Sequence, residues 1–270
     1  MKPPLLLLAC GAAIVFVPPV WAGLDLSWNA CNLAPGATTR LDFACADPDS
    51  SQHLFGSFQL PADMSGFLAM DLFIDVKSAS SALPPSWHYE PDGCNDGALT
   101  LSAARPPGNE VCENPWGVGG ATALIVAYEP GFGGDPSRAR LVASVFRQRS
   151  RTLTAGTNYY AFDLAFLMGN ASCCSGCETA AEIVWSAGRF YDSTGTSVVV
   201  QGPGLQSDCV AVNGPGCFVR LSSSTPDPLD AESKRDRLSN RGRQPHLGGY
   251  QADLPVIARD PLSAPCSGAA

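Results

Sequence analysis

Polar and apolar residues alternate most clearly in the stretch FLAMDLFIDVK, which covers residues 67–77. One set of alternate positions is apolar and consists of Leu68, Met70, Leu72, Ile74 and Val76. The other set contains the charged residues Asp71, Asp75 and Lys77. A period of two residues is that of a β-strand with one buried face. The stretch therefore predicts a strand with the apolar set inside and the charged residues outside.

Shorter or more apolar stretches of the same kind recur along the chain, rich in β-branched and aromatic residues. They are LDLSWN (24–29), RLDFAC (40–45), HLFGSFQL (53–60), ALTLSA (98–103), ATALIVAYE (121–129), ARLVASVFRQ (139–148), YYAFDLAFL (159–167), EIVWSAGRFY (182–191), SVVVQG (197–202) and CFVRL (217–221). The linkers between them are dense in glycine, proline, aspartate and asparagine, which favour turns. The best helix candidate, CETAAEIVWSA (177–187), fits the start of a strand equally well. We therefore predict an all-β, antiparallel β-sandwich of jelly-roll or immunoglobulin-like type.

The two ends of the sequence differ from its middle. Residues 1–22 combine Lys2, a short apolar run and small residues before a cut after Ala22, as a secretory signal peptide does. A rival hypothesis is a bacterial lipoprotein anchor at Cys10, which follows Leu7, Leu8 and Ala9. Residues 222–270 are rich in Ser, Pro, Asp, Arg and Gly and predict a disordered C-terminal tail. The β-sandwich domain is then expected over residues 23–221, in a protein that is secreted, periplasmic or extracellular.

Charge and cysteine content narrow the function. Residues 23–221 carry 19 acidic and 10 basic side chains, so the body is acidic and we expect no nucleic-acid partner. No later segment is long and apolar enough to predict a membrane span. The sequence has 11 cysteines, of which ten remain after the expected cleavage. An even number in an exported chain indicates a disulfide framework.

Three cysteines fall within five positions, at Cys173, Cys174 and Cys177. We expect them to share one internal bond and to reach one outside partner such as Cys266. The other expected pairs are local, namely Cys31–Cys45, Cys94–Cys112 and Cys209–Cys217. Two alternatives are a redox dithiol at Cys174 and Cys177 and a zinc site formed by those two with Cys209 and Cys217. Both are disfavoured, because no basic residue lies near the cluster and the second pair is widely spaced.

Three stretches resemble a family of uncharacterised secreted bacterial β-rich proteins: residues 83–99, 117–147 and 153–177. The shared features are an Arg-Ala-Arg strand at 138–140, the AGTxYYAF strand ending at Phe162, and the C-x-G-C turn at 174–177. A further cysteine of the family pattern is replaced by Glu182, and Cys173 is extra, so the pairing of the family need not carry over. The resemblance implies export and a β-rich domain, and it implies no activity.

Candidate ligand-binding residues are few, and no catalytic residue, cofactor or metal is predicted. Aromatic residues that could stack on a sugar lie in a proline-flanked loop and after ENP: Trp87, His88, Tyr89 and Trp116. Trp87 fits equally well as a plug at the end of the sandwich. Acidic loops at Asp47 and Asp49 and at Asp92 and Asp96 resemble calcium loops only weakly. The sequon 170–172 is a glycosylation site only in a suitable host.

Three functions follow from these features. The first is a non-enzymatic extracellular or cell-surface protein that binds carbohydrate or a protein partner. The second is a secreted hydrolase with paired carboxylates chosen from Glu90, Asp92, Glu110 and Glu113. The third is a periplasmic thiol-disulfide oxidoreductase at Cys174 and Cys177. No serine hydrolase motif is present, and nothing in the sequence nominates a Ser/His/Asp set.

Overall fold

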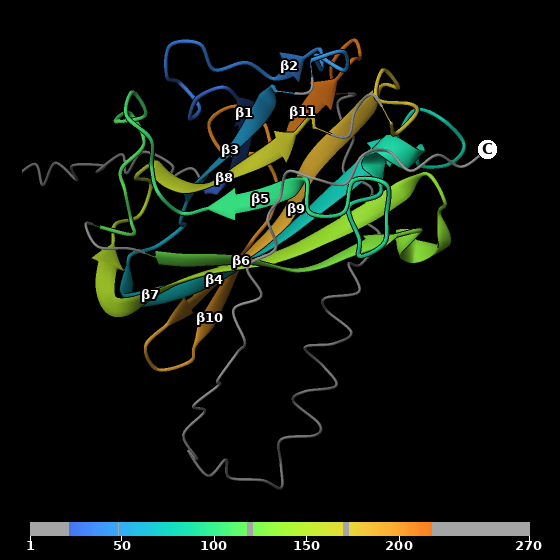
Figure 1. Ribbon diagram of the computed structural model, residues 1–270. Coiled ribbons are helices and arrows are strands. Elements are labelled where there is room, and N and C mark those ends of the chain that lie inside the picture. The colour runs from blue at the N-terminus through green and yellow to red at the C-terminus, as the bar shows by residue number, and fades with distance from the viewer. Residues whose placement is uncertain (1–21, 48, 118–120, 170–172, 218–270) are drawn as a thin grey trace, which may run out of the picture. The chain divides into compact units, whose positions relative to one another are not determined.

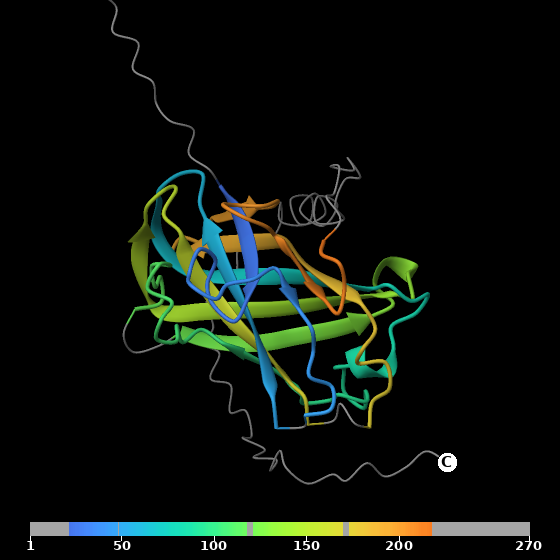
Figure 2. The same ribbon diagram turned by 90° about the horizontal axis from the view of Figure 1, so that it is seen from above.

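Two stacked β-sheets make up the fold of the computed structural model, which describes residues 22–47, 49–117, 121–169 and 173–217. The smaller sheet has the order β1-β3-β8-β5 and is antiparallel throughout. Its strands are β1 (Gly23–Trp28), β3 (Ser51–Gln59), β8 (Tyr159–Leu167) and β5 (Leu99–Ser102). Seen from above, its strands run in a different direction from those of the sheet behind it (Figure 2). The predicted all-β sandwich is confirmed.

The larger sheet has seven strands in the order β2-β11-β9-β4-β7-β6, with β10 paired to β9. They are β2 (Arg40–Leu41), β11 (Cys209–Val212), β9 (Ala181–Asp192), β4 (Met64–Ser78), β7 (Arg138–Leu153), β6 (Ala121–Pro130) and β10 (Ser197–Val200). Its pairs are antiparallel except β11 with β2, which is parallel. Two three-residue 3₁₀ helices, η1 (Pro85–Trp87) and η2 (Phe132–Gly134), lie in the connections. Within the described residues, neither helix has the length or hydropathy to cross a membrane.

Some predicted elements differ from the structure. The RLDFAC stretch forms a strand only over its first two residues, and the ambiguous stretch 177–187 contributes to β9 rather than to a helix. Residues 218–221, the predicted tail from 222 and the predicted signal peptide up to residue 21 lie outside the described residues, as do Cys10, Cys266 and the sequon 170–172.

The core between the sheets is built from large aromatic and aliphatic side chains. Phe58 of the small sheet and Phe190 of the large sheet have ring centroids 4.6 Å apart, and both are fully buried. Phe162 meets Trp185 edge to face at 5.1 Å. Aromatic pairs of this geometry stabilise a core beyond the area they bury. The alternation of inward and outward residues predicted from the sequence is therefore what joins the two layers.

Strand β4 follows the predicted alternation over most of its length. Met70, Leu72, Ile74 and Val76 are buried as expected. At the start of the strand the register shifts on both sides of Phe67, so Phe67 is buried in place of the expected Leu68. A β-bulge of this kind changes which residue faces the core.

Asp75 was expected to be exposed and is instead buried, although it lies on the outer face of the large sheet. Its carboxylate accepts hydrogen bonds from Arg140 Nε at 2.7 Å and Nη2 at 3.0 Å, and from Arg138 Nη2 at 3.3 Å. The Arg140 guanidinium in turn lies 3.8 Å from the centroid of the Phe132 ring. The alternation placed Asp75 on the correct face, but it could not show that neighbouring strands cover it.

Gly56 lies where the small sheet leaves no room for a side chain. A Cβ atom at this position would overlap the ring of Phe162, and the register of β3 with β8 shifts between Gly56 and Ser57. We expect Gly56→Ala to lower the free energy of unfolding by about 1–3 kcal/mol, because the ring must move within a packed core. Urea denaturation measures this loss. The double variant Gly56→Ala/Phe162→Leu should recover part of it, and no recovery would show that the ring is not the cause.

Candidate functional site

The aromatic residues expected to bind sugar are part of the core. Trp87, Tyr89 and Trp116 are only 1, 8 and 2% exposed. Trp87 stacks on Phe43 with centroids 5.9 Å apart, and its carbonyl oxygen accepts a hydrogen bond from the Tyr128 hydroxyl at 2.6 Å. These rings therefore offer no exposed platform for a sugar, and Trp87 closes one end of the sandwich, the alternative role considered for it.

A small cavity lies beside Trp87. Its volume of about 10 Å³ is room for a single water molecule rather than for a sugar. Two buried polar atoms in its lining, Ser86 Oγ and Asn95 Oδ1, make no hydrogen bond. The half-buried His88 Nδ1 lies 2.7 Å from Glu90 Oε1. The predicted aromatic cluster thus encloses at most one solvent molecule.

The four carboxylates considered for hydrolysis make contacts with different partners. Glu90 contacts His88, and Glu113 forms an ion pair with Arg151 at 2.7 Å. Glu110 accepts a hydrogen bond from the Gly108 amide at 3.1 Å, and backbone hydrogen bonds lower its pKa. Asp92 has a positive φ in a turn, where its amide donates to Asp96. The described contacts bring no two of the four carboxylates together.

The acidic loop at residue 47 is a turn in the structure. Asp47 Oδ1 accepts a hydrogen bond from the Asp49 amide at 3.2 Å. Over the described part of the chain, no group of three or more histidine, cysteine, aspartate or glutamate residues is placed to hold a metal ion.

Six of the cysteines form long-range disulfides, whereas the expected pair Cys209–Cys217 stays a prediction. Three bonds join residues that are 80 to 132 positions apart: Cys31–Cys112, Cys45–Cys177 and Cys94–Cys174. The predicted pairs Cys31–Cys45 and Cys94–Cys112 are therefore wrong. Sequence proximity misled the prediction because stacked sheets bring distant loops together.

These bonds also show how the two cysteines of the C-x-x-C turn are paired. Cys174 and Cys177 have separate partners, Cys94 and Cys45, so the expected internal bond of the cluster does not form. Cys173, Cys209 and Cys217 are disulfide-bonded too. A redox pair between Cys174 and Cys177 is incompatible with this arrangement, and a zinc site would need free thiolates. Bonds of this kind persist in oxidising compartments, which is consistent with a place outside the cytoplasm.

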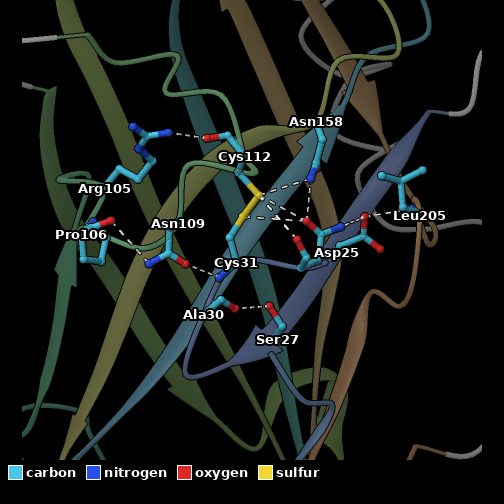
Figure 3. The surroundings of a disulfide bond; sticks show 11 residues. Asp25, Ser27, Ala30, Cys31, Arg105, Pro106, Asn109, Cys112, Asn158 and Leu205 are labelled. Atoms are coloured by element: carbon cyan, nitrogen blue, oxygen red, sulfur yellow. Dashed lines mark hydrogen bonds between the residues drawn. A yellow bond between two sulfur atoms is a disulfide. The ribbon is translucent and has the colours of Figure 1, made fainter. Parts of the chain in front are cut away.

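The Cys31–Cys112 disulfide lies within a buried polar layer over the small sheet (Figure 3). Asp25 of β1 accepts hydrogen bonds from the amides of Leu205 at 2.9 Å and Gln206 at 2.7 Å, and from Asn32 Nδ2 at 2.9 Å. Burial raises the pKa of Asp25, while the backbone amides act in the opposite direction. The layer ties two loops to β1 and so covers this part of the sheet.

At the edge of the large sheet, in contrast, β6 and β7 lie side by side (Figure 1) and carry exposed apolar side chains. Residues of β7 alternate, with Ala143 and Val145 buried and Phe146 41% exposed. Thr122 of β6 pairs with Phe146, and Leu124 pairs with Ser144, which places Leu124 on the same outer face. We call the group Leu124, Val126 and Phe146 the β6–β7 patch.

Two features distinguish the β6–β7 patch from scattered exposed residues. Leu124 and Val126 are 40 and 56% exposed, and Val126 lies at the register shift of an edge strand. Beside them, the Asp71 carboxylate accepts hydrogen bonds from the hydroxyls of Ser144 at 2.7 Å and Tyr191 at 2.6 Å. An apolar patch with a fixed polar border is typical of an interaction surface.

The sequence of β7 contains a signal for the β6–β7 patch. In ARLVASVFRQ both alternate sets include apolar residues, with Val142 and Phe146 in the set opposite the core. A strand that is apolar on both faces predicts that the second face is covered. The structure brings Leu124 and Phe146 together, although 22 positions separate them.

The comparisons with known proteins assign no family. No protein-family model matches the sequence, and no curated protein does. A similar structure is the second type II cohesin module from the adaptor ScaA scaffoldin of Acetivibrio cellulolyticus, at 9% identity and a TM-score of 0.30. The likeness covers 77% of this chain and 97% of that one. It concerns architecture alone.

Proposed function

We propose that the chain is an extracytoplasmic binding module whose β6–β7 patch docks a protein partner. The observation that carries the proposal is the exposure of Leu124, Val126 and Phe146 on two paired strands at the edge of the large sheet. Burying apolar surface contributes roughly 25 cal/mol per Å². Three side chains of this size can therefore supply the centre of an interface.

The composition of the β6–β7 patch favours protein over carbohydrate. Sugars stack on flat aromatic rings, and three of the four rings first considered for that role, Trp87, Tyr89 and Trp116, are buried. Leu124 and Val126 are aliphatic, and aliphatic side chains with one aromatic anchor suit the apolar centre of a protein interface. Asp71, Ser144 and Tyr191 beside them are held in place by hydrogen bonds and supply polar specificity.

Charge favours a different protein over a second copy of this chain. The formal net charge is −8, so two copies repel one another at close range. A partner with a basic group opposite Asp71, beside its apolar centre, would be attracted instead. Strands β6 and β7 pair over most of the length of β6, which fixes the backbone of this surface and limits the entropy lost on binding.

The test is Phe146→Asp, compared with the matched control Val111→Asp. Val111 is 46% exposed and lies in the loop between β5 and β6, outside the β6–β7 patch. A photo-crosslinking residue at 146 identifies the partner in the native extracytoplasmic fraction, and the dissociation constant is then measured with purified proteins. We expect Phe146→Asp to weaken binding at least tenfold and Val111→Asp to bind like the wild type.

Two outcomes would contradict the proposal. Equal binding by both variants would show that the β6–β7 patch is not the interface. A second such outcome is a concentration-dependent dimer in light scattering that is lost in Phe146→Asp. The molecule bound at the β6–β7 patch would then be a second copy of the chain.

A further inference from the structure

A serine, a histidine and an aspartate form a continuous hydrogen-bonded chain on the small sheet. Ser51 Oγ lies 3.1 Å from His53 Nε2. His53 Nδ1 lies 2.9 Å from both carboxylate oxygens of Asp163. Ser51 and His53 are two residues apart on β3 and so share a face, while Asp163 comes from the paired strand β8. This group is on the opposite sheet from the β6–β7 patch and is independent of it.

Hydrogen-bond chemistry fixes which atom is the donor in each of these hydrogen bonds. A carboxylate only accepts, so the proton between Asp163 and His53 belongs to Nδ1. In the neutral imidazole Nε2 is then an acceptor, and the Ser51 hydroxyl donates to it. A hydroxyl that donates to a histidine whose other nitrogen is held by a carboxylate is the arrangement of serine nucleophiles.

The surroundings hold the histidine ring and leave the hydroxyl open. The Asp163 side chain is 13% exposed and that of His53 is 41% exposed. The His53 ring is nearly parallel to the ring of Phe55, with centroids 6.3 Å apart. Burial raises the pKa of Asp163, and the hydrogen bond and charge of His53 oppose this rise. Ser51 itself is exposed to solvent.

We infer that Ser51 is a nucleophile that His53 activates, with Asp163 as the residue that positions the imidazole. The substrate class is a small activated ester, because the group lies on an exposed strand surface that a small molecule reaches directly from solvent. This activity goes beyond the proposed binding function and does not depend on it.

The reaction conserves atoms and protons. The Ser51 oxygen forms a bond to the ester carbonyl carbon while its proton passes to His53 Nε2. The bond between that carbon and the alcohol oxygen then breaks, and the leaving oxygen takes the proton from Nε2. A water molecule then attacks the acyl carbon while its proton passes to His53 Nε2. The bond between that carbon and Ser51 Oγ breaks, Oγ takes the proton back from Nε2, and the carboxylic acid is released. General acid–base assistance of this kind contributes about 10²–10⁴-fold in rate.

The experiment uses the full-length chain with p-nitrophenyl acetate and with a fluorophosphonate probe. We expect release of p-nitrophenolate above the buffer rate and a phosphonate adduct that peptide mass spectrometry places on Ser51. Ser51→Ala and His53→Gln should each lose at least 100-fold in rate, and the adduct should disappear in the first and fall sharply in the second. Ser65→Ala and His88→Gln are the matched controls and should react like the wild type, since both residues lie outside the group.

Asp163 needs a readout that a structural role alone would not change. Asp163→Asn should lower kcat at least tenfold with KM unchanged. Its urea denaturation midpoint should equal that of the active control variants. The inference is overturned if the probe does not label Ser51. It is also overturned if His53→Gln leaves the labelling unchanged, because Ser51 would then react as an ordinary surface serine. Esterase activity that persists in Ser51→Ala would overturn it as well.

Discussion

Replacing Cys45 and Cys177 with alanine is expected to lower the free energy of unfolding by about 3–5 kcal/mol. The two residues are 132 positions apart, and their bond joins the loop after β2 to the loop before β9. Closing so long a loop removes conformational entropy from the unfolded chain, for which the entropy relation gives about 5 kcal/mol. Total stabilities of single domains are about 5–15 kcal/mol, so this one bond accounts for much of the margin.

Urea denaturation of the oxidised wild type and of Cys45→Ala/Cys177→Ala measures the effect. The matched control is Cys94→Ala/Cys174→Ala, which removes a bond across 80 positions. Because loop-closure entropy grows only with the logarithm of length, the two losses should agree within about 1 kcal/mol. A loss below about 1 kcal/mol in the first variant would show that the unfolded chain is already restricted without the bond.

The architecture could be predicted from local sequence, whereas the cysteine pairing could not. Alternation in FLAMDLFIDVK identifies a strand because it depends only on neighbouring positions. The partner of Cys45 depends instead on how the two sheets stack, which no local pattern records. Phe67 faces the core where Leu68 was expected for a similar reason. The β-bulge that turns it inward depends on how β4 pairs with β7 and β9, which the local sequence does not show.

The same distinction applies to the candidate sites. The predicted strand begins at His53, and Ser51 shares its face only because β3 begins at Ser51 in the structure. Asp163 joins them only because β3 pairs with β8, 110 positions away in the sequence. Trp87 was a candidate because aromatic residues near prolines suggest an exposed loop, yet its ring stacks on Phe43. Composition identifies residue types suited to a site, and topology decides whether they meet or are buried.

Replacing Arg140 with alanine is expected to cost about 3–5 kcal/mol of stability, because it leaves a buried carboxylate without its main partner. Asp75 is 4% exposed, and Arg140 donates two of its three described hydrogen bonds. The remaining donor, Arg138, is longer at 3.3 Å and comes from a more exposed side chain. Loss of the Arg140 contact with the Phe132 ring adds to the effect.

Lys77→Ala is the matched control, because Lys77 lies on the same face of β4 and its ion pair with Asp135 is exposed to solvent. Water already solvates both of these charges, so the urea midpoint should hardly change. The double variant Asp75→Leu/Arg140→Leu should recover most of the stability lost in Arg140→Ala, since apolar pairs replace buried ion pairs at little cost. If Arg140→Ala behaved like Lys77→Ala, the Asp75 carboxylate would have to reach water or Arg138 in the variant. The ion pair would then orient β4 and β7 without stabilising them.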